Sequence, residues 1–264
     1  MVLTLTLGGG ALLCAIAWPC SSSAGCHEDS FVASQHGWLL PSGLAFLMLS
    51  GILRATAQGG WAVLSLALNM RRQRMAQPPL QLEAAAKRIG AGQIRFLETS
   101  AALAFCGGLR RPYIYVSREV VVRLPPKELD AVLLHELDHV RSREPLRRLL
   151  AWSLAEGFFF FPVLRWWSAL RSERAELRAD EAAIAGRGRQ ALARALLMLE
   201  DARQPAWLAA LGSANAARVA QLLGAPLPPR QPDRWLLVGS GAGLITAWSA
   251  TACIIHDVLP MALA

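Results

Sequence analysis

The amino-acid sequence predicts a mainly α-helical membrane protein that also carries a small α+β domain. Apolar residues make up 54% of the 264 residues, more than in an ordinary soluble domain. Uncharged apolar runs stand near both ends of the chain, with arginines beside several of them. Between these runs, strand-like segments precede an amphipathic helix with two histidines. We expect membrane helices over 1–70, the α+β domain over 71–225 and a linker with a final helix over 226–264.

The first 37 residues predict a membrane helix followed by a short external loop. Residues 2–18 are uncharged and mostly apolar, which is barely long enough to span a bilayer. A signal peptide is the alternative, although no Lys or Arg precedes the run. Cys20 and Cys26 lie in the loop over 19–37 and would form a disulfide if it faces an oxidising compartment; otherwise they stay unpaired.

A second apolar stretch covers residues 38–70 and predicts one long helix, or two helices broken at Gly59 and Gly60. Arginines follow at once over 71–74, so the positive-inside rule places this end in the cytoplasm. The net charge of +8 comes mostly from arginines that flank apolar runs. This pattern favours anionic lipid over nucleic acid as the partner of the positive charge.

The residues after Pro78 and Pro79 predict the α+β domain. Residues 81–89 predict a short amphipathic helix. Residues 93–105 and 112–122 are rich in Ile, Val, Phe and Tyr and predict two or three strands, joined by a loop over 106–111.

A helix beginning at Pro125 and Pro126 carries the strongest chemical signal. Its apolar residues recur at helical spacing, and acidic residues lie in its first turn. His135 and His139 are four residues apart and therefore share a face. Two imidazoles at this spacing can bind one zinc ion, and Glu136 can polarise a water on it. The alternative is that both histidines are core residues of an apolar helix.

A second helix predicts the remaining ligand. Glu176 and Asp180 are four residues apart, so they share a face. Glu176 could complete a site of two histidines and one carboxylate with one position open for water. Asp180 could then accept a hydrogen bond from a ligand imidazole. The alternative is a solvated helix face on which these acids pair with Arg174 and Arg178.

Three further segments complete the chain. Residues 146–167 are strongly apolar and contain three tryptophans, which predicts a membrane-embedded hairpin, an interfacial helix or a buried core helix. Residues 190–203 and 206–223 predict amphipathic helices. Residues 235–255 form an uncharged run of 21 residues, which predicts a transmembrane helix running from the cytoplasm to the outside.

These motifs, in this order, resemble the BlaR/MecR-type membrane zinc metallopeptidases and, more distantly, the HtpX and CAAX-protease families. The resemblance covers about residues 38–225 and rests on the segments 109–114, 124–129, 135–145, 176–182 and 217–223. It implies a zincin-like, gluzincin-like metallopeptidase domain with one Zn²⁺ bound by His135, His139 and Glu176. It also implies that Glu136 is the general base, that Asp180 supports a ligand, and that the site faces the cytoplasm of a bacterial-type inner membrane.

Two features depart from the resemblance. Asp138 stands where these families usually have a small residue. The printed chain leaves no room for the penicillin-binding sensor domain of the β-lactam receptors. We therefore expect no β-lactam trigger.

The resulting expectation is an integral-membrane zinc endopeptidase acting on a cytoplasmic regulatory protein, such as a transcriptional repressor, or on a membrane-proximal substrate. We expect the substrate to lie along a strand at 113–117, with Tyr113, Tyr115 or an arginine as a second oxyanion donor. The alternatives are a non-catalytic membrane scaffold or signalling protein, a general quality-control protease, and a basic protein that binds lipid or nucleic acid.

Overall fold

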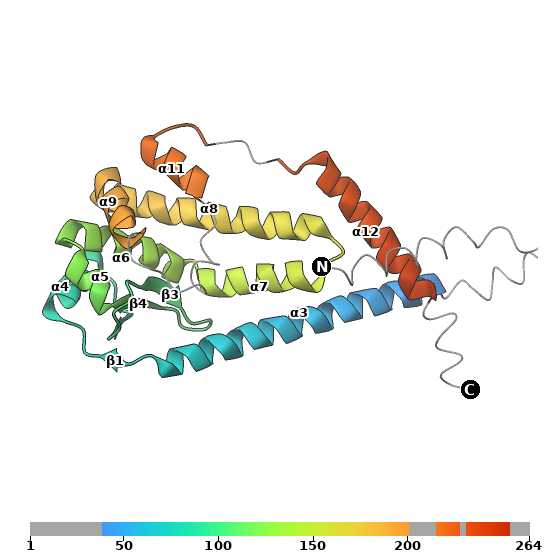
Figure 1. The fold of residues 1–264 in the computed structure, drawn as a ribbon, viewed down its shortest axis with the longest axis horizontal. Helices are drawn as coiled ribbons and strands as arrows, with labels where there is room; N and C mark the ends of the chain where they lie inside the picture. Colours follow the sequence, from blue (N-terminus) through green and yellow to red (C-terminus); the bar gives the residue numbers. More distant parts are fainter. Residues whose placement is uncertain (1–38, 201–214, 228–230, 254–264) are drawn as a thin grey trace, which may run out of the picture. The chain divides into compact units, whose positions relative to one another are not determined.

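The computed structural model describes residues 39–200, 215–227 and 231–253 (Figure 1). The expected helix over 2–18, the cysteines Cys20 and Cys26, and residues 206–214 of an expected helix lie outside these residues. The chain divides into two compact units, which we describe separately. Unit 1 comprises Met1–Gln58, Ser153–Trp166 and Pro232–Ala264, and unit 2 comprises Gly59–Trp152 and Trp167–Gln231.

Helices make up most of the described chain, with four short strands near the middle of the sequence (Figure 1). In chain order the elements are α3 (Leu39–Arg72), β1 (Met75–Ala76), α4 (Leu80–Ile89), β2 (Ile94–Leu97), β3 (Ala104–Gly107), β4 (Tyr113–Ser117), α5 (Arg118–Arg123), α6 (Pro126–Arg141), α7 (Glu144–Gly157), α8 (Pro162–Arg187), α9 (Arg189–Glu200), α11 (Asn215–Leu223) and α12 (Arg234–Cys253). The expectation of a mainly helical protein with a small α+β part is confirmed.

The four strands form one sheet in the order β1-β2-β4-β3. β4 pairs in parallel with β2 and antiparallel with β3, so both of its edges are occupied. The expectation that a substrate adds to residues 113–117 is therefore wrong, because no backbone groups of β4 are left for another strand. Among the described residues, β3 pairs on one side only and forms an edge of the sheet.

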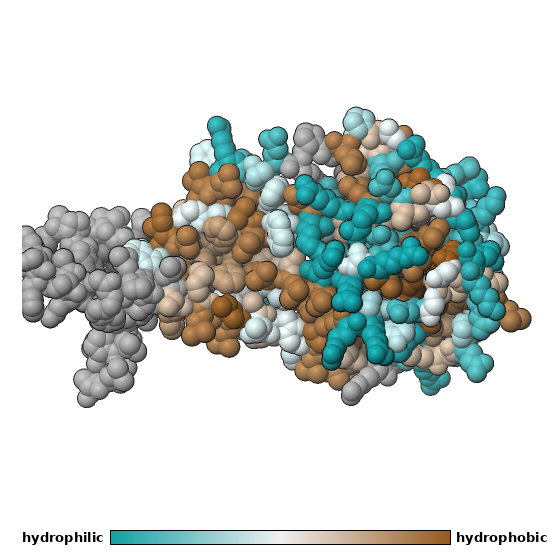
Figure 2. All heavy atoms as spheres, turned by 180° about the vertical axis from the view of Figure 1, so that it is seen from behind, coloured by the Kyte–Doolittle hydropathy of each residue, from teal (hydrophilic) through white to brown (hydrophobic). Residues whose placement is uncertain are grey.

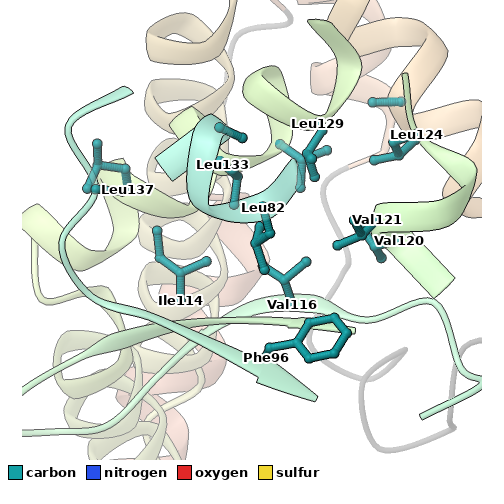
Figure 3. Close-up of a cluster of buried hydrophobic side chains, with 14 of the residues drawn as sticks. Leu82, Phe96, Ile114, Val116, Val120, Val121, Leu124, Leu129, Leu133 and Leu137 are labelled. Atoms are coloured by element: carbon teal, nitrogen blue, oxygen red, sulfur yellow. The ribbon is translucent and has the colours of Figure 1, made fainter. Parts of the chain in front are cut away.

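One hydrophobic core joins the sheet to α4, α5 and α6 in unit 2 (Figure 3). Leu82 of α4 and Leu133 of α6 are fully buried against Ile114 and Val116 of β4. The apolar periodicity of α6 accounts for this packing, because it places one helix face on the sheet. The labelled core residues are Leu82, Phe96, Ile114, Val116, Val120, Val121, Leu124, Leu129, Leu133 and Leu137.

Helix α5 was not anticipated, because its valines continue the strand-like composition of β4. Ser117 ends the strand and caps the helix. The Ser117 hydroxyl accepts hydrogen bonds from the backbone N–H groups of Leu103 at 2.9 Å and Val120 at 3.4 Å. A serine in this position satisfies a backbone donor of the first helical turn and so turns the strand directly into a helix.

The strands expected over 93–105 and 112–122 are shorter in the structure: residues 98–103 separate β2 from β3, β3 continues to Gly107, and β4 ends at Ser117. Residues 39–72 form one continuous helix, not two broken at Gly59 and Gly60. The apolar segment over 146–167 divides between α7 and α8, and α8 begins at Pro162. Proline suits the first turn of a helix, because the N–H group it lacks would have no partner there.

Unit 1 is built from the first part of α3, the end of α7, the start of α8, and α12. It exposes many large apolar side chains: Phe46, Leu49, Ile52, Leu53, Phe159, Trp235, Leu237, Val238 and Ile245. Figure 2 shows one face of the molecule, on which hydrophobic residues are drawn in brown. Within the described part of the chain, no helix combines the length and the apolarity needed to cross a membrane. The transmembrane helices expected over 38–70 and 235–255 stay predictions.

Candidate metal centre

The two histidines of α6 face one another as their spacing predicts. Both are buried, and their Nε2 atoms are 3.1 Å apart. The two rings meet edge to face with centroids 4.7 Å apart. α6 can hold them in this way because residues one turn apart share a helix face, while the opposite face packs on the sheet.

Glu176 of α8 completes a group of three. Its Oε2 atom lies 3.5 Å from Nε2 of His135, and its Oε1 atom lies 3.7 Å from Nε2 of His139. Zinc bound tetrahedrally at about 2.0–2.1 Å places its ligand atoms about 3.3 Å from one another. The observed separations are close to that value, and the donor set of two imidazoles and one carboxylate suits zinc. These residues therefore fit a metal ion.

Asp180 lies behind His135, as its position one turn after Glu176 predicts. It is fully buried, and its Oδ1 atom is 2.9 Å from Nδ1 of His135. A carboxylate at Nδ1 favours the tautomer that carries its proton there, which leaves Nε2 available to a metal. Arg218 of α11 binds the same carboxylate through two hydrogen bonds of 2.7 and 2.8 Å.

Two arginines contact Glu176, and the sequence did not single them out as site residues. Nη2 of Arg148 donates to Oε1 of Glu176 at 2.7 Å, and Nη1 of Arg218 lies 3.6 Å from Oε2. Arg148 belongs to α7 and Arg218 to α11, so both reach the site from helices distant in sequence. Arg218 falls in the segment 217–223 that contributed to the resemblance, whereas no local pattern distinguishes Arg148 from its neighbouring arginines.

The surroundings of the two histidines shift their pKa values in opposite directions. Burial disfavours a charge on His135, but the carboxylates of Asp180 and Glu176 outweigh it and raise the pKa of His135 to about 9. Burial and the neighbouring positive charge of His135 lower the pKa of His139 to about 3. Burial alone would raise the pKa of Glu176, but the histidines and Arg148 hold it below its usual range. Without a metal, these shifts favour the charged imidazolium at His135 and the neutral imidazole at His139 near neutral pH.

Glu136 follows the first histidine and is buried beside the group of three. Burial raises the pKa of its carboxyl group, against the opposing charges of His135, Arg148 and Arg218. Glu136 is not part of the cluster that could hold the ion, which consists of His135, His139 and Glu176 within the described residues. A carboxylate of raised pKa next to the cluster suits a general base.

The remaining residues singled out in the sequence have other contacts. The guanidinium of Arg95 lies 4.2 Å from the ring centroid of Tyr113. Tyr115 stacks on Phe105 with ring centroids 5.1 Å apart. These contacts lie within the sheet, and the role of either tyrosine as an oxyanion donor stays a prediction.

Asp138, the unusual residue of the motif, forms an ion pair with Arg178. Its Oδ2 atom accepts from Nε of Arg178 at 2.9 Å. The extra acid next to the histidine pair is thereby matched by a positive charge from α8.

Two histidines face one another on α6, a carboxylate from α8 lies beside both, and a second carboxylate lies behind one of them. This arrangement defines a candidate metallopeptidase centre. The model of the BlaR1 peptidase M56 family matches residues 63–220, which include all of these residues. The chain belongs to the BlaR1 peptidase M56 family. A comparison with curated proteins found no match.

Proposed function

We propose that this protein is a zinc-dependent endopeptidase of the cytoplasmic membrane. The observation that carries the proposal is the convergence of His135, His139 and Glu176 on one point. The contact of Asp180 with His135 adds support, because histidines that bind metals commonly donate their second nitrogen to a carboxylate. Zinc held by the three side chains would supply a Lewis acid that polarises a water molecule and the scissile carbonyl group.

Glu136 would move the proton in this reaction. As the oxygen of water bonds to the carbonyl carbon, Glu136 takes a proton from the water. It then gives that proton to the leaving nitrogen as the C–N bond breaks. The raised pKa of Glu136 brings its proton affinity closer to what both transfers need.

The substrate would bind in an extended form along β3. β3 is an edge of the described sheet, and it packs beside α6. Added strands bind to such edges through main-chain hydrogen bonds, which suits a peptidase that must hold a peptide backbone next to its metal. We propose a cytoplasmic regulatory protein, such as a transcriptional repressor, or a membrane-proximal protein as the substrate.

The membrane location rests on the apolar surface of unit 1 and on the arginines at residues 71–74. Large exposed apolar patches mark surfaces that bind protein or lipid. The arginines favour an orientation with the peptidase domain on the cytoplasmic side.

Metal content and activity of the detergent-purified full chain test the proposal. We expect close to one zinc per chain in the wild type and in Glu136→Gln, and loss of zinc in His135→Ala. Glu136→Gln should lower kcat on a peptide or casein substrate by about 10²–10⁴-fold, because the base is lost while the metal stays. Glu119→Gln on α5 is the matched control and should change neither quantity.

Element-resolved mass spectrometry identifies the metal, since two histidines and one carboxylate also bind iron in other proteins. Circular dichroism establishes that each variant is folded. A folded wild type that takes up no zinc would overturn the proposal and favour a non-catalytic membrane scaffold. Zinc uptake with cleavage of many unfolded proteins, and no preferred target, would indicate a quality-control protease.

A further inference from the structure

The two arginines at Glu176 are held in different ways. Arg218 makes two hydrogen bonds to Asp180 and approaches Glu176 only at 3.6 Å. Arg218 is therefore committed to the carboxylate behind His135. Arg148 instead donates directly to Glu176 at 2.7 Å, and a quarter of its side chain is exposed to solvent. Arg148 thus contacts Glu176, a candidate metal ligand, and is also partly exposed to solvent.

Arg148 is also close to Glu136 and to the edge strand. Against the larger effect of burial, the positive charge of Arg148 lowers the pKa of Glu136, and it acts there more strongly than Arg218 does. Burial raises the pKa of the Cys106 thiol on β3, and Glu136 and Arg148 are the two charges that affect this thiol most. The geometry agrees: Arg148 donates to Glu176, Glu176 lies 3.5 Å from His135, and Glu136 follows His135 on α6, the helix that packs beside β3. A peptide bound along β3 would present its scissile bond to this part of unit 2.

We propose that Arg148 is a catalytic residue whose guanidinium binds the oxygen of the scissile carbonyl group. This inference rests on the proposed function. When the water oxygen bonds to the carbonyl carbon, the electron pair of the C=O double bond moves to the carbonyl oxygen. A guanidinium is always charged and has five N–H donors, so it can bind Glu176 and also stabilise this negative charge. Arg148 transfers no proton, and Glu136 carries the proton from water to the leaving nitrogen.

The two tyrosines of β4, which were the other candidates for this role, have different contacts. Tyr113 and Tyr115 are engaged by Arg95 and Phe105 within the sheet. The charged donor comes instead from α7, which contributes none of the three candidate ligands.

The test compares Arg148→Met and Arg148→Lys with the wild type, as full-length zinc-loaded protein in detergent. We expect unchanged zinc content, a KM close to that of the wild type, and a kcat about 10²–10³-fold lower in Arg148→Met. Arg148→Lys should recover part of the loss, because lysine keeps the charge but not the fork of donors. Arg178→Met is the matched control, since Arg178 also pairs with a carboxylate on a neighbouring helix, and it should retain kcat.

A second measurement does not depend on turnover. A phosphonamidate peptide imitates the charged oxygens that develop during hydrolysis, and calorimetry gives its affinity for the zinc-loaded protein. Its Kd should rise in Arg148→Met by about the same factor as kcat/KM falls. An unchanged inhibitor Kd, or wild-type kcat in Arg148→Met, would overturn the assignment. Loss of zinc in step with kcat would also overturn it, by making Arg148 a residue that positions Glu176.

The two proposals fail in different ways. Glu136→Gln inactive beside a fully active Arg148→Met would remove the role of Arg148 and leave the peptidase intact. Glu136→Gln as active as the wild type would reject the proposed function. In that case the inhibitor Kd still decides whether Arg148 binds a charged oxygen.

Discussion

The two compact units hold their helices together with different kinds of contact. In unit 2, α6 and α8 are joined by charged pairs along their length: Asp130 with Arg187, His135 with Asp180, and Asp138 with Arg178. In unit 1, α3 and α7 meet through small residues. A Cβ added at Gly157 would lie 2.6 Å from both the Cβ of Ala55 and the carbonyl oxygen of Gly51.

This difference matters for what each unit can do. A buried pair such as His135 with Asp180 fixes both the direction and the distance between side chains, which a metal centre requires to within a fraction of an ångström. Small residues instead let two helix backbones approach closely, and packing then holds them, as is common between helices in a membrane. Removing a charge should therefore be most damaging in unit 2, and adding a methyl group should be most damaging in unit 1.

The largest effect should come from Asp180→Ala in unit 2. Asp180 is fully buried and pairs with Arg218, whose side chain is 18% exposed. Removing one partner of a buried pair costs about 3–5 kcal/mol, because the other charge is left without compensation. Zinc affinity should also fall about 10–100-fold, since His135 loses the carboxylate at Nδ1. Chemical denaturation of the metal-free protein and competition with a chelating dye measure the two losses.

The double variant Asp180→Ala with Arg218→Met is the control. It should be more stable than Asp180→Ala alone, because the buried guanidinium is removed together with its partner. Equal instability of the single and double variants would show that lost volume, and not an unpaired charge, is responsible.

In unit 1, Gly157→Ala should lower stability by about 1–3 kcal/mol, which is typical of overpacking. The new methyl group meets the backbone of α3 at Gly51, which cannot rotate away as a side chain would. Thermal unfolding in detergent measures the change. Gly241→Ala in α12 is the matched control, because no described atom beyond the neighbouring backbone of α12 lies within 4 Å of its added Cβ. There, helix propensity alone predicts a gain of up to about 1 kcal/mol. Equal effects at the two glycines would contradict the view that close packing organises unit 1.

The part of the site that lies on single helices could be predicted from the sequence. His135 and His139, like Glu176 and Asp180, are four residues apart, and helical periodicity alone places each pair on one face. The meeting of α6 with α8 was a hypothesis drawn from the need for a third metal ligand and from the resemblance, because periodicity says nothing about which helices touch. Arg148 and Arg218 could not be found in this way, since their partners lie 28 and 38 residues away in the sequence.

The sheet shows the same limit. The strand segments could be predicted from their composition, but not their order, and β4 lies in the interior although it follows β3 in the chain. Strand order depends on long-range pairing, which leaves no trace in the alternation of side chains. The end of β4 was also hidden, because Val120 and Val121 are typical of strands and only the cap at Ser117 begins a helix there.

Asp138→Ala should have the smallest effect, although Asp138 lies within the histidine motif. Its partner Arg178 is 44% exposed, and solvent screens such a pair, so its loss should cost at most about 1 kcal/mol. Zinc affinity should stay within about twofold of the wild type, because the Asp138 carboxylate pairs with Arg178. The carboxylate that contacts His135 is that of Asp180. Denaturation and dye competition, run beside Asp180→Ala, measure both quantities. A loss of zinc as large as that of Asp180→Ala would mean that the charge of Asp138 acts on the metal itself. The geometry of the site would then depend on the partly exposed Asp138–Arg178 pair as well as on the buried pairs of α6 and α8.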